Sequence, residues 1–255
     1  MTMQKKPLSV GFQGEFGAYS EIAAEAFGEP APFPTFENLF NAVLKKQVDC
    51  AAVPITNAIA GVVKENAELL WRFQKRIKIL AESMIPISHC LLGMHGSTIK
   101  RAREVHSHWQ ALAQCQNFFQ RYKHLTPVET YDTAGSAKQL AESGDVAQLV
   151  IASERAAERY GLRILKRAIN DMKQNRTKFF IIAPSTSRLV LSQKKQKSVV
   201  ICKSLQDVQP YIPQVLSCQA IPTRKKPFEV HYLIEVQGEI SDKRFAHLGT
   251  FEQAR

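Results

Sequence analysis

Short apolar strands alternate with amphipathic helices along most of this chain, and this alternation limits the possible folds more than any other feature. Leu8–Phe12 is a predicted strand, followed by a glycine turn and a helical face that begins at Tyr19. Asp49–Pro54 and Ile77–Met84 are further predicted strands, separated by another amphipathic stretch. Such alternation is typical of α/β sheets with mostly parallel strands. We therefore expect an α/β fold with ligands at the carboxyl ends of its strands.

A second unit of the same kind follows the first. Arg103–His106 and Gln148–Ala152 are predicted strands. Ser107 is predicted to begin and cap a helix, because Gln110 follows at the spacing of a capping box. Ser153 is predicted to cap a later helix, which runs through Tyr160. The segment Ile169–Ala183 would then return the chain to the first sheet. Two lobes joined by crossing segments enclose a cleft, where small-ligand sites usually form.

The C-terminal part differs from these two units. Residues 185–197 are the best linker candidate, because proline, serine and threonine precede a basic run there. Ser198–Lys203 and Glu229–Val236 are predicted strands of the remaining segment, 198–255. So short a segment is marginal as an independent fold, and we expect it to pack on another surface, such as a second subunit.

Composition excludes several classes of protein. Hydrophobic residues make up 45% of the 255 residues, enough for a core, and no apolar run approaches a membrane span. The net charge of +11 is not arranged as a nucleic-acid module, so we expect no nucleic-acid partner. The five cysteines form no CxxC pair and the histidines have no metal spacing. With no signal peptide in the first residues, we expect a cytoplasmic protein with reduced thiols.

One polar segment stands out as a candidate site. Thr177 and Lys178 lie within Ile169–Ile182, where a loop rich in amide and basic side chains enters a hydrophobic strand. Catalytic groups often occupy such junctions, although a solvated turn before a buried strand has the same pattern. The glycine turn at Gly14–Ser20 is a second candidate, because a helix N-terminus attracts anions. Close packing of strand on helix explains the same glycines equally well.

Several segments carry motifs in a fixed order. They are Gly11–Glu21, Val53–Gly61, Ile87–Gly93, Ser107–Cys115, Asp132–Glu142, Ala152–Leu165 and Asn175–Ile182. Together they resemble the prephenate dehydratase family, whose near relative is arogenate dehydratase. The resemblance covers about residues 8 to 183, and its specificity comes from the ordered set, since each motif alone is weak.

The resemblance implies a fold and a reaction. The fold would be a two-lobed catalytic domain, like periplasmic binding proteins, over residues 1–184. Its lobes would be 1–85 with 170–184, and 86–169. The activity would be that of a carbon–oxygen lyase without cofactor or metal. It would convert prephenate to phenylpyruvate, water and carbon dioxide in phenylalanine biosynthesis.

The resemblance also implies roles for individual residues. Thr177 would be the main catalytic group, and the other catalytic residues would be Asn57, Ser107 and Gln114. The implied substrate-binding residues are Ala18, Tyr19, Ser20, Thr56, Lys178 and Phe179. Elimination needs a proton or strong hydrogen bond for the departing hydroxyl, and positioned donation of this kind contributes about 10²–10⁴-fold.

Four positions depart from the family motifs, and they leave alternatives open. Lys178 replaces an arginine, which keeps the charge but loses the planar two-pronged grip on a carboxylate. Thr56 replaces a glutamate, Ala58 a serine and Trp109 a proline. The alternatives are an arogenate dehydratase, and a non-catalytic small-molecule binding protein on the same fold.

The tail, 198–255, resembles the family's regulatory ACT domain in incomplete form. Gln219–Pro222 stands where the family has Glu-Ser-Arg-Pro, so Pro222 alone is kept and is the candidate regulatory residue. No room for the usual second helix remains between Gly238 and His247. We expect a small α+β, ferredoxin-like module that serves dimerisation, which makes a homodimer or homotetramer the expected assembly.

Overall fold

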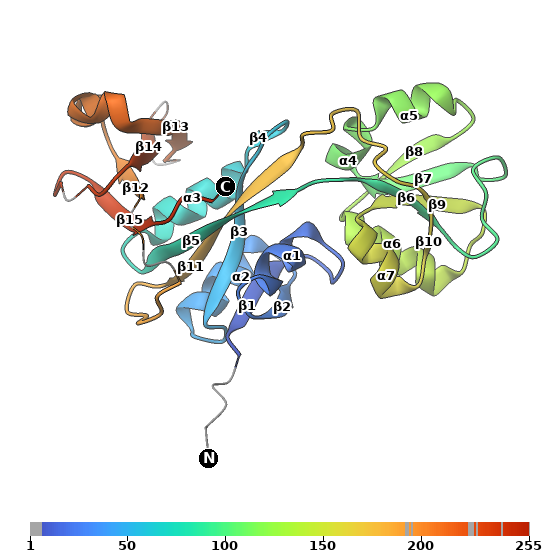
Figure 1. The fold of residues 1–255 in the computed structure, drawn as a ribbon, viewed down its shortest axis with the longest axis horizontal. Helices are drawn as coiled ribbons and strands as arrows, with labels where there is room; N and C mark the ends of the chain where they lie inside the picture. Colours follow the sequence, from blue (N-terminus) through green and yellow to red (C-terminus); the bar gives the residue numbers. More distant parts are fainter. Residues whose placement is uncertain are drawn as a thin grey trace, which may run out of the picture.

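The computed structural model describes residues 7–191, 194, 196–223, 227, 229–240 and 242–254. Their strands form three sheets, which lie in a row in Figure 1. We call the first sheet with its helices the first lobe, the second with its helices the second lobe, and the last the C-terminal sheet. The first lobe lies between the other two (Figure 1).

The first lobe has the strand order β2-β1-β3-β11-β5, with β4 paired to β3. Its strands are β1 (Ser9–Gln13), β2 (Glu29–Phe33), β3 (Cys50–Asn57), β4 (Gly61–Val62), β5 (Ile77–Pro86) and β11 (Arg176–Pro184). Its helices are α1 (Tyr19–Glu25), α2 (Phe36–Leu44) and α3 (Lys64–Phe73). β1 is parallel to β2 and β3, but β11 is antiparallel to β3 and β5. Since β3 and β5 both run against β11, the strands β1, β2, β3 and β5 share one direction. The expectation of mostly parallel strands is therefore confirmed, with β11 and the short β4 as exceptions. β11 runs the other way because it re-enters the sheet from the second lobe.

The second lobe has the strand order β10-β6-β9-β7-β8. Its strands are β6 (Cys90–Gly93), β7 (Glu104–His108), β8 (Thr126–Thr130), β9 (Gln148–Ala152) and β10 (Arg163–Lys166). Its helices are α4 (Trp109–Ala113), α5 (Gln116–Arg121), α6 (Thr133–Ser143) and α7 (Glu154–Tyr160). β7 is parallel to β8 and β9, whereas β6 is antiparallel to β9 and β10.

Two predicted helix caps have different outcomes. Ser153 accepts a hydrogen bond from the Ala156 N–H, which confirms it as the N-cap of α7. Ser107 is not a cap, because it lies inside β7 and its hydroxyl donates to the Ile151 carbonyl at 2.6 Å. His108 caps α4 instead.

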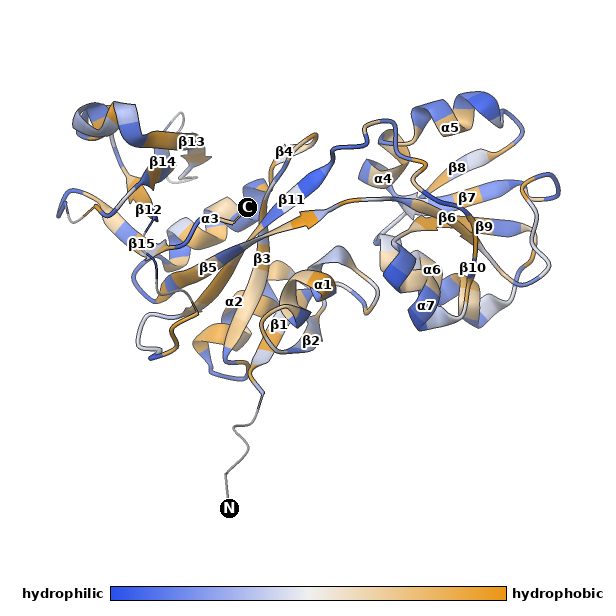
Figure 2. Cartoon of the chain, in the orientation of Figure 1, coloured by the Kyte–Doolittle hydropathy of each residue, from blue (hydrophilic) through white to orange (hydrophobic). Residues whose placement is uncertain are grey.

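Two segments cross between the lobes, and the second of them leads into β11 (Figure 1). The return of this segment to the first sheet confirms the prediction for Ile169–Ala183. β11 is hydrophilic where it enters the sheet and hydrophobic beyond, as Figure 2 shows. Residues Phe179–Pro184 are buried, so the strand is anchored in the core while its first residues reach the space between the lobes.

The C-terminal sheet is antiparallel, with the order β13-β14-β12-β15. Its elements are β12 (Lys197–Cys202), the 3₁₀ helix η1 (Leu205–Gln214), β13 (Val215–Pro222), β14 (Val230–Gln237) and β15 (Ala246–Phe251). In the described residues between β14 and β15 there is no helix. The expected small and incomplete α+β module is thus confirmed.

The first sheet is covered on both faces. α1 packs on one face, with Ala23 and Ala24 against Val10 and Ile181. On the other face α2, α3 and the C-terminal sheet share a single core, in which Phe180 meets residues such as Phe251. The C-terminal sheet is therefore built onto the first lobe. No helix in the described part of the chain is long and apolar enough to span a bilayer.

Candidate active site between the lobes

A cavity of about 650 Å³ lies between the two lobes. It is lined by residues of both lobes and of the segments that cross between them. The predicted site residues that line it are Ala18, Tyr19, Ser20, Asn57, Gln114, Thr177 and Phe179. The structure thus brings together seven side chains that are far apart in the sequence.

The Thr177 hydroxyl is held by Asn57. The two residues lie opposite each other on β11 and β3, and Asn57 Nδ2 donates to Thr177 Oγ1 at 2.9 Å. The orientation of the Asn57 amide is fixed, because its Oδ1 accepts hydrogen bonds from the N–H groups of Ile59 and Ala60. Since Thr177 Oγ1 is an acceptor in this contact, its own proton is available to a ligand.

Asn175 joins Asn57 to the second lobe. Asn57 Nδ2 donates to Asn175 Oδ1 at 2.8 Å, and Asn175 Nδ2 donates to Gln114 Oε1 at 2.8 Å. Asn175 is only 1% exposed, so its amide serves these two contacts and does not face a ligand. Asn175 is not among the predicted site residues, although it stands in a motif segment two residues before Thr177.

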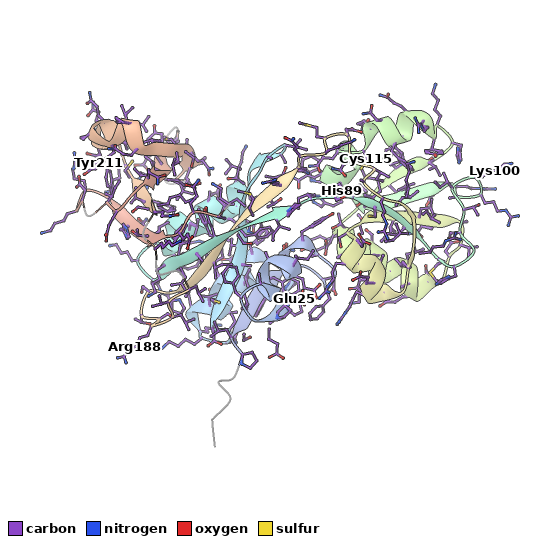
Figure 3. All side chains as sticks on the ribbon, viewed as in Figure 1. Glu25, His89, Lys100, Cys115, Arg188 and Tyr211 are labelled. Atoms are coloured by element: carbon purple, nitrogen blue, oxygen red, sulfur yellow. The ribbon has the colours of Figure 1, made fainter. Side chains whose placement is uncertain are left out.

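His89 completes this network of amides. Its Nε2 lies 3.1 Å from Gln114 Oε1, which can only accept, so Nε2 carries the proton. Burial lowers the pKa of His89 to about 4, against the opposing hydrogen bond with Gln114, and the ring is neutral at pH 7. His89 lies where the chain crosses between the lobes (Figure 3). With Gln114 Oε1 accepting two hydrogen bonds, the Gln114 amide N–H₂ is left for a ligand.

Tyr19 forms an uncharged side of the cavity. Its hydroxyl donates to the Ser88 carbonyl at 2.6 Å, and its ring meets His89 edge-on at 5.9 Å. Burial raises the pKa of the Tyr19 phenol above its ordinary value, so it stays protonated. The charged residues that line the cavity are Lys64, Glu65 and Asp132.

Four predicted site residues lie away from this cavity. Ser107 is fully buried within the second sheet. Thr56 and Lys178 neighbour Asn57 and Thr177, but successive strand residues face opposite sides of a sheet. They contact the C-terminal sheet, where Thr56 accepts from Gln219 and Lys178 pairs with Glu235. Pro222 lies at the exposed end of β13, and its regulatory role stays a prediction.

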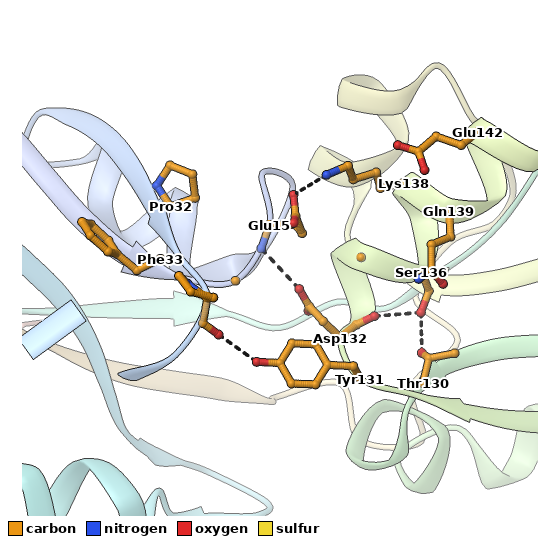
Figure 4. Close-up of a pocket in the computed structure, with 13 residues that line it drawn as sticks. Glu15, Pro32, Phe33, Thr130, Tyr131, Asp132, Ser136, Lys138, Gln139 and Glu142 are labelled. Atoms are coloured by element: carbon orange, nitrogen blue, oxygen red, sulfur yellow. Dashed lines mark hydrogen bonds and ion pairs between the residues drawn. The ribbon is translucent and has the colours of Figure 1, made fainter. Parts of the chain in front are cut away.

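A smaller cavity, of about 480 Å³, lies beside the first (Figure 4). Contacts between the lobes bridge it. Lys138 Nζ is 3.1 Å from Glu15 Oε2, Asp132 Oδ2 accepts from the Glu15 N–H, and the Tyr131 hydroxyl donates to the Pro34 carbonyl. Gly14 and Glu15 of the predicted glycine turn line it, but none of the predicted catalytic or substrate-binding residues does. We therefore place the candidate site in the larger cavity.

No group of three or more His, Cys, Asp or Glu side chains within the described residues is arranged to hold a metal ion. The donors at the floor of the larger cavity are hydroxyl and amide groups. Such groups can offer hydrogen bonds to an oxygen-rich anion or to a departing oxygen.

The fold and the cleft define a two-lobed α/β protein, and the cavity between its lobes is the candidate site for a small molecule. The family model for prephenate dehydratase matches residues 10–187. The chain therefore belongs to the prephenate dehydratase family.

Individual relatives support this membership. Arogenate dehydratase/prephenate dehydratase 2 of Arabidopsis thaliana is 41% identical over 188 residues, which cover 71% of this chain and 49% of the relative. The chain thus spans about half the length of this relative. Prephenate dehydratase from Arthrobacter aurescens, solved in complex with L-Phe, shares the fold with a TM-score of 0.83 at 20% identity, covering 96% of this chain and 90% of that one. GqqA, described as a novel type of quorum quenching acylase, is 28% identical with a TM-score of 0.77, covering 91% and 88%.

Proposed function

We propose that this protein is a prephenate dehydratase, which removes water and carbon dioxide from prephenate to give phenylpyruvate. The observation that carries the proposal is the Thr177 hydroxyl, held by Asn57 with its proton free in a cleft between two lobes. Membership of the family supports the same reaction class.

Thr177 would act on the leaving hydroxyl of the ring. As the ring carboxylate departs as carbon dioxide, its bonding electrons enter the ring and the carbon–oxygen bond breaks. The hydroxyl takes up one proton through the Thr177 Oγ–H and leaves as water, and solvent returns the proton to Thr177. Aromatisation supplies much of the driving force, so a weakly acidic donor suffices.

The other polar groups of the cavity would hold the substrate. The Gln114 amide N–H₂ and the Ser20 hydroxyl are donors that suit a carboxylate, and Lys64 adds a positive charge. The neutral His89 keeps Gln114 oriented without adding charge. This set of donors needs no cofactor.

Arogenate is the second candidate substrate. It differs from prephenate by an ammonium group on the side chain, and the carboxylates of Glu65 and Asp132 line the cavity where they could pair with it. The Arabidopsis relative carries both activities in its name.

Product analysis with each substrate tests the proposal. The purified chain is incubated separately with prephenate and arogenate, and phenylpyruvate and phenylalanine are measured, with calorimetric titration in parallel. We expect phenylpyruvate from prephenate. Phenylalanine from arogenate alone would reassign the substrate, and binding without turnover of either would make the chain a non-catalytic binder. The expected self-association and cytoplasmic location stay predictions.

A further inference from the structure

Four charged side chains form a buried cluster between the first lobe and the C-terminal sheet. Lys178 comes from β11, Glu82 from β5, Lys197 from β12 and Glu235 from β14. Glu82, Lys197 and Glu235 are at most 8% exposed. Two positive and two negative charges thus meet out of water, on the face of the first sheet opposite the cavity.

Glu235 is the centre of this charge cluster. Lys178 Nζ lies 2.6 and 2.8 Å from its two oxygens, Lys197 Nζ lies 2.7 Å from Oε2, and the Ser217 hydroxyl donates to Oε1. Burial alone would raise the pKa of Glu235, but the ammonium groups of Lys197 and Lys178 outweigh it and hold the pKa below its ordinary value. The carboxylate is therefore ionised whenever the protein is folded near neutral pH.

Glu82 links the cluster to β5, the last strand in the order of the first sheet. Lys197 Nζ pairs with Glu82 Oε2, and the Ala254 N–H donates to Glu82 Oε1 at 2.8 Å. Packing is close here as well, because a Cβ added at Gly249 would lie 2.2 Å from the Ile79 carbonyl oxygen of β5. The C-terminal sheet is thus seated directly on β5 and β11 with little room to shift.

The contacts fall on the strand neighbours of the site residues. Lys178 follows Thr177 on β11, and Thr56 precedes Asn57 on β3. Thr56 Oγ1 accepts a hydrogen bond from Gln219 Nε2 at 3.0 Å. The C-terminal sheet therefore contacts both β3 and β11, in each case one residue away from the Asn57–Thr177 hydrogen bond.

We propose that Lys178 and Glu235 are positioning residues, through which the C-terminal sheet fixes the Thr177 hydroxyl relative to Asn57. This inference rests on the proposed function. Lys178 holds the segment where β11 changes register against β3, between Lys178 and Phe179. A misplacement of about 1 Å at a reacting group can lower the rate about 100-fold.

The test uses kinetic constants of full-length variants. Lys178→Met removes the charge but keeps the apolar stem, and we expect kcat to fall at least about 10-fold with KM within about twofold. Lys178→Arg keeps the charge and should retain most of kcat. Lys194→Met, in the exposed pair with Glu252, is the matched control and should leave both constants unchanged.

Two further measurements keep the test decisive. Gln219→Ala removes the hydrogen bond to Thr56 on β3 and leaves no buried charge unpaired. We expect kcat to fall less in this variant than in Lys178→Met. Hydrogen exchange at the Thr177 and Lys178 amides should accelerate in Lys178→Met and Glu235→Gln, with or without substrate. Unchanged exchange and kcat in the folded Lys178→Met variant would overturn the proposal, and so would a rise in KM alone, which is the result for a substrate-binding lysine. If the wild-type chain turned over neither substrate, the proposed function would fail while the exchange data still tested the positioning.

Discussion

Asn57 uses its whole side-chain amide to fix the geometry of the cleft floor. Its Nδ2 donates to Asn175 and Thr177, and its Oδ1 accepts from two backbone N–H groups. Asn175 in turn donates to Gln114, so a side chain of the second lobe is linked to the first. At the scale of single residues, the site is a network of amides around one hydroxyl.

Asn175→Ala tests this network. Loss of the buried amide removes one hydrogen-bond partner from Asn57 and one from Gln114, so the Thr177 hydroxyl is held less firmly in its direction. We expect kcat for the active substrate to fall about 10–100-fold with a smaller change in KM. Asn117→Ala, at an exposed asparagine of α5, is the control and should match the wild type.

His89 predicts a pH dependence of stability. Its folded-state pKa of about 4 lies below the unfolded value of about 6.5, so the unfolded chain binds more protons between these values. The neutral, buried His89 makes its full contribution to the free energy of unfolding above pH 6.5. About 3 kcal/mol of that free energy is lost as the pH falls to 4. Thermal melts of the wild type and His89→Gln should therefore converge over this range. Curves that stay parallel would contradict the assignment, and His124→Gln, at the surface, is the control.

The sequence predicted part of this site and missed the rest for a physical reason. Thr177, Asn57 and Gln114 stand in recognisable motifs, and all of them line the cavity. The roles of Asn175 and His89 depend on partners distant in the chain, which no local pattern shows. The implied substrate contacts of Thr56 and Lys178 do not reach the cavity, because the direction of a strand side chain depends on which face of the sheet it takes.

At the scale of elements, strands and helices with a clear period of apolar residues could be predicted from the sequence. Elements without such a period could not. The edge strand β2 contains Pro30 and Pro32, a composition that resembles a turn. Within the described part of the chain it pairs with β1 alone, and such an edge position tolerates proline. Ser107 fitted a capping box by spacing, but β7 continues through it.

Contact between α1 and α7 sets how closely the lobes approach. The Ser153 hydroxyl donates to the Gly17 carbonyl at 2.5 Å, and the Tyr160 hydroxyl donates to the Phe16 carbonyl at 2.7 Å. Arg155 of α7 pairs with Glu25, which lies on the side of α1 that faces the second lobe (Figure 3). These contacts join the two lobes beside the cleft.

Gly17→Ala should open this contact. Gly17 has φ +95°, and an added Cβ would lie 2.8 Å from the Ala156 Cα atom, so the lobes must separate. We expect weaker substrate binding and a larger radius of gyration by X-ray scattering. Gly144→Ala is the matched control, because Gly144 also has positive φ but open space around it. Its cost should be limited to backbone strain of about 1–2 kcal/mol. Equal effects of the two substitutions would contradict a role in lobe contact.

At the scale of the whole molecule, the two lobes and the added C-terminal sheet were foreseeable from strand order and length. The packing of the C-terminal sheet on the first lobe could not be predicted from the sequence. Phe180 follows the cleft residue Phe179 and Phe251 ends the last strand, yet both lie in the same core. This shared core makes the C-terminal sheet part of the scaffold that carries β11.

Turnover of prephenate by Thr177→Ala, measured beside the wild type and Thr177→Ser, tests the central claim most directly. The proposed role of the hydroxyl predicts that the alanine variant loses at least about 100-fold in kcat while calorimetric binding of prephenate persists. The serine variant, which keeps an Oγ–H within reach of Asn57, should retain measurable turnover. An alanine variant with wild-type kcat would show that the cleft hydroxyl takes no part in the reaction.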